Sequence, residues 1–111
     1  MLWAITSFFN PAGYQNKLTN YRAFRKHLRL PLIAVELSFT GRFVLQAGDA
    51  DVLVQLSGGD ILWQKERLLN VALRHLPFDC DIVAWLDCDV IFADRDWAAR
   101  ACAALGEFCV L

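Results

Sequence analysis

Two glycine-rich patterns that bind phosphate groups are missing from this sequence. No segment matches GxGxxG or GxxxxGK[ST], so a dinucleotide-binding Rossmann site and a P-loop both lack their main sequence support. No apolar run reaches the roughly 18 residues of a membrane-spanning helix, so no transmembrane segment is expected. The start, MLWAITSFFNPAG, lacks the basic region and cleavage site of a signal peptide and is better interpreted as a strand followed by a loop.

Cysteine patterns typical of zinc sites are also absent. The cysteines lie at positions 80, 88, 102 and 109, with no CxxC pair and no Cys/His cluster at zinc spacing. Cys88 and Cys109 stand in apolar runs, where a reduced thiol packs well. We therefore expect four free thiols and a reducing compartment, the cytoplasm.

Charge is scarce, and apolar residues are abundant. The net charge is −1, so bulk electrostatics do not predict binding to nucleic acid. Hydrophobic residues make up 57% of the 111-residue chain, above the roughly 45–50% of an average soluble protein. A chain of this length forms a single domain with little interior to bury the excess. The excess predicts an exposed apolar surface that meets the rest of a larger domain, a partner or a second copy in a homo-oligomer.

Apolar patterns predict strands that alternate with helices. Strands are expected over 2–8, 31–39 and 82–86, with one or two shorter strands over 43–46 and 52–56. Helices are expected from an Asn10-Pro11 start to Pro31, over 61–76, and from Asp94 to Leu105. Residues 108–111 resemble the start of another strand. This order predicts an α/β fold with a mainly parallel sheet and helices on both faces.

Two aspartates follow the apolar segment IVAWL, residues 82–86. Because that run does not alternate with polar residues, we expect a strand buried on both faces. If it stays extended, Asp87 and Asp89 point to the same side, about 6.6 Å apart at Cα. Like charges this close favour a bound Mn²⁺ or Mg²⁺, and the carboxyl end of a parallel strand is where open α/β sheets bind ligands. The alternative is that both carboxylates cap the next turn and are solvated.

Polar residues at the ends of the first two strands form a second candidate group. Thr6, Ser7 and Asn10 end the first strand and begin its loop, where hydroxyl groups and a helix N-terminus could line a nucleotide site. Glu36 ends the second strand, a position at which an acidic residue often binds a ribose hydroxyl. The alternative for Glu36 is a salt bridge to the first helix, whose polar face carries Lys17, Arg22, Arg25, Lys26 and Arg29.

A lysine interrupts the apolar stripe of the second predicted helix. That stripe consists of Ile61, Leu62, Leu68, Leu69, Ala72, Leu73 and Leu76. A lysine facing the core is costly unless it is paired. Lys65 therefore points along the sheet edge toward a phosphate or the aspartates, or it extends its ammonium into water. Asn70 lies on the polar face of the same helix, so periodicity assigns it no special role.

In their order along the chain, these residues resemble the nucleotide-binding half of a glycosyltransferase of the GT-A fold. The first strand ends in TSFFNP, the second in an acidic residue, the helix contains WQKERLLN, and the next strand ends in DCD. WQKERLLNVAL is similar to the FNRAKLLNVG stretch of the β-1,4-galactosyltransferases, and LDCDVIF is similar to their DxD segment. The likeness to bacterial glycosyltransferase-like proteins of unassigned substrate spans essentially all 111 residues.

The resemblance implies a metal-dependent transferase for a nucleotide-diphosphate sugar, with a UDP-sugar favoured and an acceptor that the sequence does not identify. Asp89 would ligate Mn²⁺ or Mg²⁺ at the diphosphate, and Asp87 would bind the metal through water, or the ribose or sugar. A whole GT-A domain is about twice this length. Residues 1–111 are therefore expected to be its N-terminal portion, with the acceptor site and any catalytic base beyond it.

The remaining site residues take their roles from the same resemblance. Thr6, Ser7, Asn10 and Glu36 would hold the nucleoside. Lys65 would take the place of a basic residue near the nucleotide sugar, and Asn70 the place of the asparagine in the family's motif.

Two other classes of protein stay open. A phosphoryl-transfer enzyme of the haloacid-dehalogenase type also carries DxD after an apolar strand. Here residues 90–92 are expected to continue the strand and a full βα region precedes it, which disfavours that class. The other class is a non-catalytic module that pairs with another subunit through an exposed apolar edge.

Overall fold

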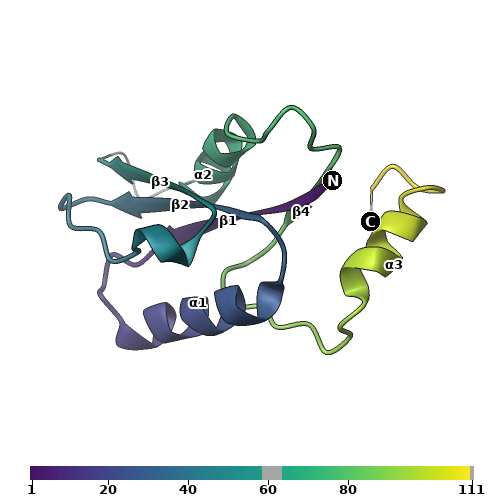
Figure 1. The fold of residues 1–111 in the computed structure, drawn as a ribbon. Coiled ribbons are helices and arrows are strands. Elements are labelled where there is room, and N and C mark those ends of the chain that lie inside the picture. The colour runs from purple at the N-terminus through teal and green to yellow at the C-terminus, as the bar shows by residue number, and fades with distance from the viewer. Residues whose placement is uncertain (59–63, 111) are drawn as a thin grey trace.

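The described residues of the computed structural model, 1–58 and 64–110, form an α/β fold around one parallel sheet (Figure 1). Its strands are β1 (Leu2–Phe9), β2 (Leu32–Ser38), β3 (Val52–Ser57) and β4 (Ile82–Trp85). They lie in the order β3-β2-β1-β4, and every neighbouring pair is parallel. The predicted α/β class with a parallel sheet is confirmed.

The helices of the described part are α1 (Gln15–Leu28), α2 (Gln64–Leu73) and α3 (Trp97–Ala104), with a short 3₁₀ helix η1 (Ala47–Asp49). Helices α1 and α2 lie on opposite faces of the sheet, as predicted, and α3 lies apart from the strands, at the end of the sheet where the N-terminus lies (Figure 1). Within residues 1–58 and 64–110, no helix is long and apolar enough to cross a membrane.

Side chains of β1 and β2 alternate between two apolar cores, one on each face of the sheet. The α1 face buries Ala4, Phe8, Leu32 and Ala34 with Tyr21, Phe24 and Leu28. The α2 face buries Ile5, Ile33, Val35 and Leu37 with Leu68, Leu69 and Ala72. Residues 32–37 are all buried, so β2 is covered on both faces along nearly its whole length.

Strand β4 is not the fully buried strand that its apolar run predicts. It lies at one end of the strand order, and its burial alternates along the strand. Val83 and Trp85 are 38% and 55% exposed, and their register with Trp3 and Ile5 puts them on the α2 face. Helix α2 covers β1 and β2 instead. A continuous apolar run does not distinguish a strand covered on both faces from an edge strand with one open face, so this prediction is wrong.

Helix α1 begins at Gln15 and not at Pro11. The side chain of Asn10 closes the loop before it: Oδ1 accepts from the backbone N–H of Tyr14 at 3.1 Å, and Nδ2 donates to the carbonyl of Tyr14 at 2.8 Å. Asparagine favours such side-chain turns as much as helix caps, so the predicted N-cap role of Asn10 is wrong. The helix ends at Leu28, just before Arg29 in the left-handed region with φ 55°, in line with the stop expected at Pro31.

Further predictions differ from the structure, among them the end of the second helix, which is at Leu73 and not at Leu76. Residues 43–46 form no strand and lead into η1, and residues 108–110 form no strand either. The third helix begins at Trp97, after the predicted start at Asp94. The predicted start of the second helix, 61–63, and the last residue of the predicted final strand, 111, lie outside the described residues. The side chains of Gln64 and Lys65 lie outside them as well.

Candidate functional site

A pocket of about 320 Å³ lies at the carboxyl ends of β1 and β2. Its walls come from the end of β1 and the loop 10–13, from the first turns of α1, and from residues 36–44 at and beyond the end of β2. Strand β1 also stands where the strand order reverses, with β2 on one side and β4 on the other. In open parallel sheets this edge and this switch point are where ligands bind.

Glu36 lines the pocket although it is only 2% exposed. Its Oε2 accepts from the backbone N–H of Val44 at 2.8 Å. Its Oε1 accepts from the backbone N–H of Leu45 at 3.2 Å and from Nε2 of Gln55 at 3.0 Å. Within the described residues no ion pair joins Glu36 to α1, so the salt bridge considered as an alternative is not formed. Glu36 instead holds the segment after β2 against the sheet.

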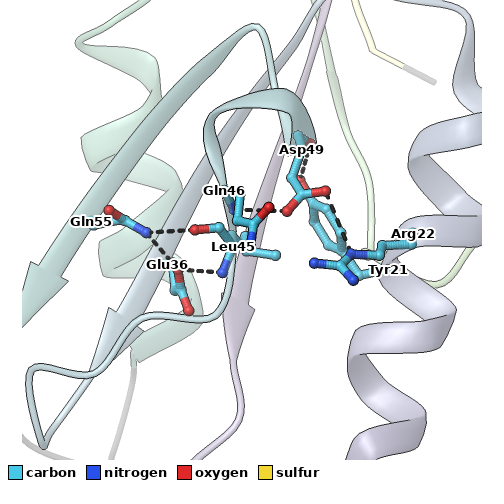
Figure 2. A network of polar contacts seen from close by, with 7 residues as sticks. All are labelled: Tyr21, Arg22, Glu36, Leu45, Gln46, Asp49 and Gln55. Carbon is cyan, nitrogen blue, oxygen red and sulfur yellow. Dashed lines mark hydrogen bonds and ion pairs between the residues drawn. The ribbon is translucent and has the colours of Figure 1, made fainter.

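The other end of that segment is held by α1 (Figure 2). The Asp49 carboxylate accepts from the backbone N–H of Gln46 at 2.7 Å, which closes η1. The Tyr21 hydroxyl donates to the carbonyl of Asp49 at 2.7 Å, and Nε of Arg22 lies 3.6 Å from Oδ1 of Asp49. Burial raises the pKa of Tyr21, so the phenol keeps the proton that it donates. Residues 44–49, of which Val44 lines the pocket, are therefore held from both sides.

Asp87 and Asp89 lie in a turn and not in an extended strand. After β4 the backbone N–H of Leu86 still donates to the carbonyl of Ile5 at 3.1 Å, and that of Val90 then donates back to Asp87 at 3.4 Å. Both aspartates are exposed. The expectations of an extended aspartate pair and of a strand continuing through 90–92 are wrong. Aspartate side chains favour turns over strand ladders, and two of them end the pairing with β1. We call residues 87–90 the aspartate turn.

Thr6 positions this turn and is not part of the pocket wall. It is fully buried, and its hydroxyl donates to the carbonyl of Leu86 at 2.7 Å. This bond ties β1 to the residue that precedes the aspartate turn. Ser7 is half-buried beside Val35 and, within the described residues, is not among those lining the pocket. Asn10 does line the pocket, with its side chain engaged by Tyr14.

Lys17 contacts the pocket end of β1, and sequence analysis missed it. Its ammonium donates to the carbonyl of Phe9 and lies 6.0 Å from the centre of the Phe8 ring. Burial raises the pKa of the Cys88 thiol, the Lys17 charge opposes that rise, and Asp89 adds to it. The lysine is therefore within electrostatic reach of the turn. Helical periodicity placed it on the solvated face, but a long side chain in the first turn of a helix can reach back to the preceding strand.

Helix α2 contributes less to this edge than the sequence suggested. Asn70 is exposed on α2, which covers the face of the sheet opposite α1, whereas the pocket lies on the α1 side. The structure therefore does not bring Asn70 to the pocket. The prediction for Lys65 concerns a side chain outside the described residues and is not tested.

The carboxylates of the aspartate turn fit a cation only in part. Across residues 1–58 and 64–110, no three or more His, Cys, Asp and Glu side chains are grouped to hold a metal ion. Magnesium and manganese are commonly bound by one or two carboxylates together with substrate phosphates. Asp87 and Asp89 therefore suit a cation that arrives with a phosphate ligand, and not a permanent protein-only metal site.

The pocket with the buried Glu36 and the aspartate turn thus follow the carboxyl ends of strands on either side of β1. Strand β4 ends level with Ile5, whereas β1 continues to Phe9. Together they offer a hydrogen-bond acceptor at one end and a pair of carboxylates at the other. In comparisons with known proteins, no protein-family model, no curated protein and no solved structure matches this chain.

Proposed function

We propose that this chain binds the donor of a metal-dependent glycosyltransferase of the GT-A type, a nucleotide-diphosphate sugar. One observation carries the proposal: the pocket at the ends of β1 and β2 and the aspartate turn after β4 both follow the carboxyl ends of strands in one parallel sheet of order β3-β2-β1-β4. Two strand spacings, about 10 Å, separate β2 from β4 across the sheet. Strand β4 ends level with Ile5, and Glu36 lies opposite Phe8, which adds about 10 Å along the strands. Glu36 and the end of β4 are therefore about 14 Å apart at Cα. A nucleoside diphosphate can span that distance, with its nucleoside in the pocket and its phosphates at the turn.

Each part of the site has a distinct task in this proposal. Glu36 accepts a hydrogen bond from a ribose hydroxyl in the pocket. Asp87 and Asp89 hold Mn²⁺ or Mg²⁺ together with the diphosphate, and Lys17 adds positive charge next to them. A bound cation stabilises the negative charge that develops on the leaving diphosphate. The likeness to the β-1,4-galactosyltransferases favours a UDP-sugar as donor.

The decisive experiment is calorimetric titration of nucleotides and nucleotide sugars in Mn²⁺ and again in EDTA. We expect metal-dependent binding of at least one nucleotide diphosphate. Asp89→Ala should weaken it at least about tenfold, because one carboxylate ligand of the cation is lost. Asp79→Ala is the matched control, since Asp79 is an exposed aspartate that precedes β4, at the opposite edge of the sheet. Metal-dependent binding that survives Asp89→Ala unchanged would remove Asp89 from the site.

A second candidate function is an interaction module, favoured by the open face of β4. Trp85 is 55% exposed, and Val83 on the same face and Ile91 beyond the aspartate turn are also exposed. Apolar side chains of this size on a sheet edge suit contact with another chain or a second copy. This candidate predicts a self-associating sample that binds no nucleotide. Sedimentation velocity over a hundredfold range of protein concentration, combined with the titration above, separates it from the first.

The structure also bears on the phosphoryl-transfer alternative. A strand continuing through residues 90–92 was one of two arguments against it, and the aspartate turn removes that one. The other remains, because a full βα region precedes the two aspartates. In such an enzyme Asp87 would be the nucleophile. Hydroxylamine-sensitive labelling of Asp87 by a phosphate donor would identify this class. If Asp87 stays unlabelled in a sample that binds nucleotide, the donor-binding proposal is favoured.

A further inference from the structure

Gln55 fixes the orientation of the Glu36 carboxylate without being part of the pocket wall. The two residues are neighbours in the register of β2 and β3, so their side chains leave the same face of the sheet. Nε2 of Gln55 donates to Oε1 of Glu36 at 3.0 Å and to the carbonyl of Leu45 at 3.0 Å. Figure 2 shows the amide of Gln55 between these two acceptors.

The amide of Gln55 has one suitable orientation in this contact. Its two N–H groups face two acceptors, the Glu36 carboxylate and the Leu45 carbonyl. A flipped amide would turn its own oxygen toward both of them, so oxygen would face oxygen. Gln55 therefore bridges the Glu36 carboxylate and the backbone carbonyl of Leu45.

The two oxygens of the Glu36 carboxylate accept different numbers of hydrogen bonds. Its oxygens offer about four acceptor positions. Oε1 receives two donors, Leu45 N–H and Gln55 Nε2, whereas Oε2 receives Val44 N–H. Capacity for a further donor thus remains on Oε2 of a side chain that is almost fully buried and lines the pocket. A buried carboxylate with spare acceptor capacity favours a ligand that brings a hydroxyl or N–H group.

We propose that Gln55 is a positioning residue that makes the pocket selective for a ligand with a hydroxyl donor. The inference rests on the proposed function, in which that donor is a ribose hydroxyl. Gln55 keeps Oε1 occupied and directs the remaining acceptor of Glu36 into the pocket. Without the amide, the carboxylate can rotate and share its two oxygens differently between Val44 and Leu45, and the preference for the hydroxyl is lost.

The test compares two ligands that differ only in those hydroxyls, UDP and 2′,3′-dideoxy-UDP, in the presence of Mn²⁺. The wild-type protein should bind UDP at least about tenfold more tightly, as one hydrogen bond to a charged acceptor implies. Gln55→Met keeps the length of the side chain and removes both donors. This variant should reduce the preference for UDP over dideoxy-UDP to about threefold or less. The affinity for UDP should fall, and the affinity for dideoxy-UDP should stay unchanged. Asn20→Met, which removes an exposed amide from α1 outside the pocket lining, is the control and should preserve the preference.

The outcomes separate this inference from the function on which it rests. An undiminished preference in Gln55→Met overturns the positioning role and leaves the donor site standing. Equal weakening of both ligands also overturns it, since that pattern means general damage to the pocket. If the folded wild-type protein binds neither ligand, the inferred selectivity is refuted. If it also binds no other nucleotide diphosphate in the calorimetric titration, the donor-binding proposal fails as well.

A measurement on the unmodified protein covers the case in which Gln55→Met does not fold. The side-chain amide signals of Gln55 in ¹⁵N–¹H spectra should shift when UDP is added, because the ligand changes the charge distribution on Glu36. They should shift much less with dideoxy-UDP. Equal responses to the two ligands would overturn the positioning role without any substitution.

Discussion

Replacement of Glu36 by leucine tests whether this carboxylate is the support of the pocket wall. The side chain is 2% exposed and receives three donors. Two of them can regain water after the substitution, because Val44 is 44% exposed and Gln55 is also exposed. The N–H of Leu45 cannot, since Leu45 is 4% exposed.

The expected magnitude follows from these three contacts. A buried donor left unpaired costs about 1–3 kcal/mol, and each hydrogen bond to a charged acceptor contributes about 1.5–3 kcal/mol. Part of the loss is offset, because leucine needs no desolvation of a charge. We expect the free energy of unfolding to fall by about 3 kcal/mol. For a domain of this size, that lowers the melting temperature by roughly 12 °C.

Urea unfolding followed by circular dichroism measures this free energy directly. Glu107→Leu, at an exposed glutamate after α3, is the control and should change stability by no more than about 0.5 kcal/mol. The slope of the transition should stay the same in both variants, since the surface exposed on unfolding is unchanged. A loss below about 1 kcal/mol in Glu36→Leu would refute the view that this carboxylate holds the segment after β2.

Two further predictions concern contacts of α1 with the β2–β3 connection. Burial acts to raise the pKa of Asp51, but hydrogen bonds from Arg25 and from the N–H of Leu32 outweigh it and lower that pKa. Asp51 therefore contributes stability above its ordinary pKa of about 4 that is lost as the pH falls through the lower folded-state value. Asp51→Asn should flatten the acid side of a plot of urea midpoint against pH, and an unchanged plot would contradict this. Tyr21→Phe removes the donor to the Asp49 carbonyl and should lower the free energy of unfolding by about 1 kcal/mol. A stability equal to wild type in the same urea assay would show that water replaces the hydroxyl.

Much of the fold could be predicted from the sequence, because the predictions depended on local patterns. Alternating strands and helices were enough for a parallel sheet covered on both faces, and the apolar stripe of the second helix correctly placed Leu68, Leu69 and Ala72 in the core. The wrong predictions depended on the neighbours of a segment. An apolar run such as Ile82–Trp85 is compatible with a central or an edge strand, and the choice is made by what packs against Val83 and Trp85.

The candidate site was predictable in its residue types and less so in its geometry. One of the two interpretations of Glu36 was that it faces a ligand because it ends a strand, and it does line the pocket. Its partners come from a segment without regular structure and from the next strand, and neither periodicity nor spacing connects Val44 or Gln55 with it. The side chain of Lys17 reaches back to the carbonyl of Phe9, and such a contact depends on a loop conformation that residue spacing does not reveal.

The position of β1 between β2 and β4 has a consequence for the order in which the sheet is assembled. Strand β2 follows β1 after a single helix, whereas the bond from Thr6 to Leu86 joins residues 80 positions apart. The entropy cost of closing a loop grows with its length, so β4 should join the sheet last and open first. Its amide hydrogens should then exchange with solvent faster than those of β1 and β2. A ligand bound at the aspartate turn would slow that exchange, because it stabilises only the state in which β4 is docked.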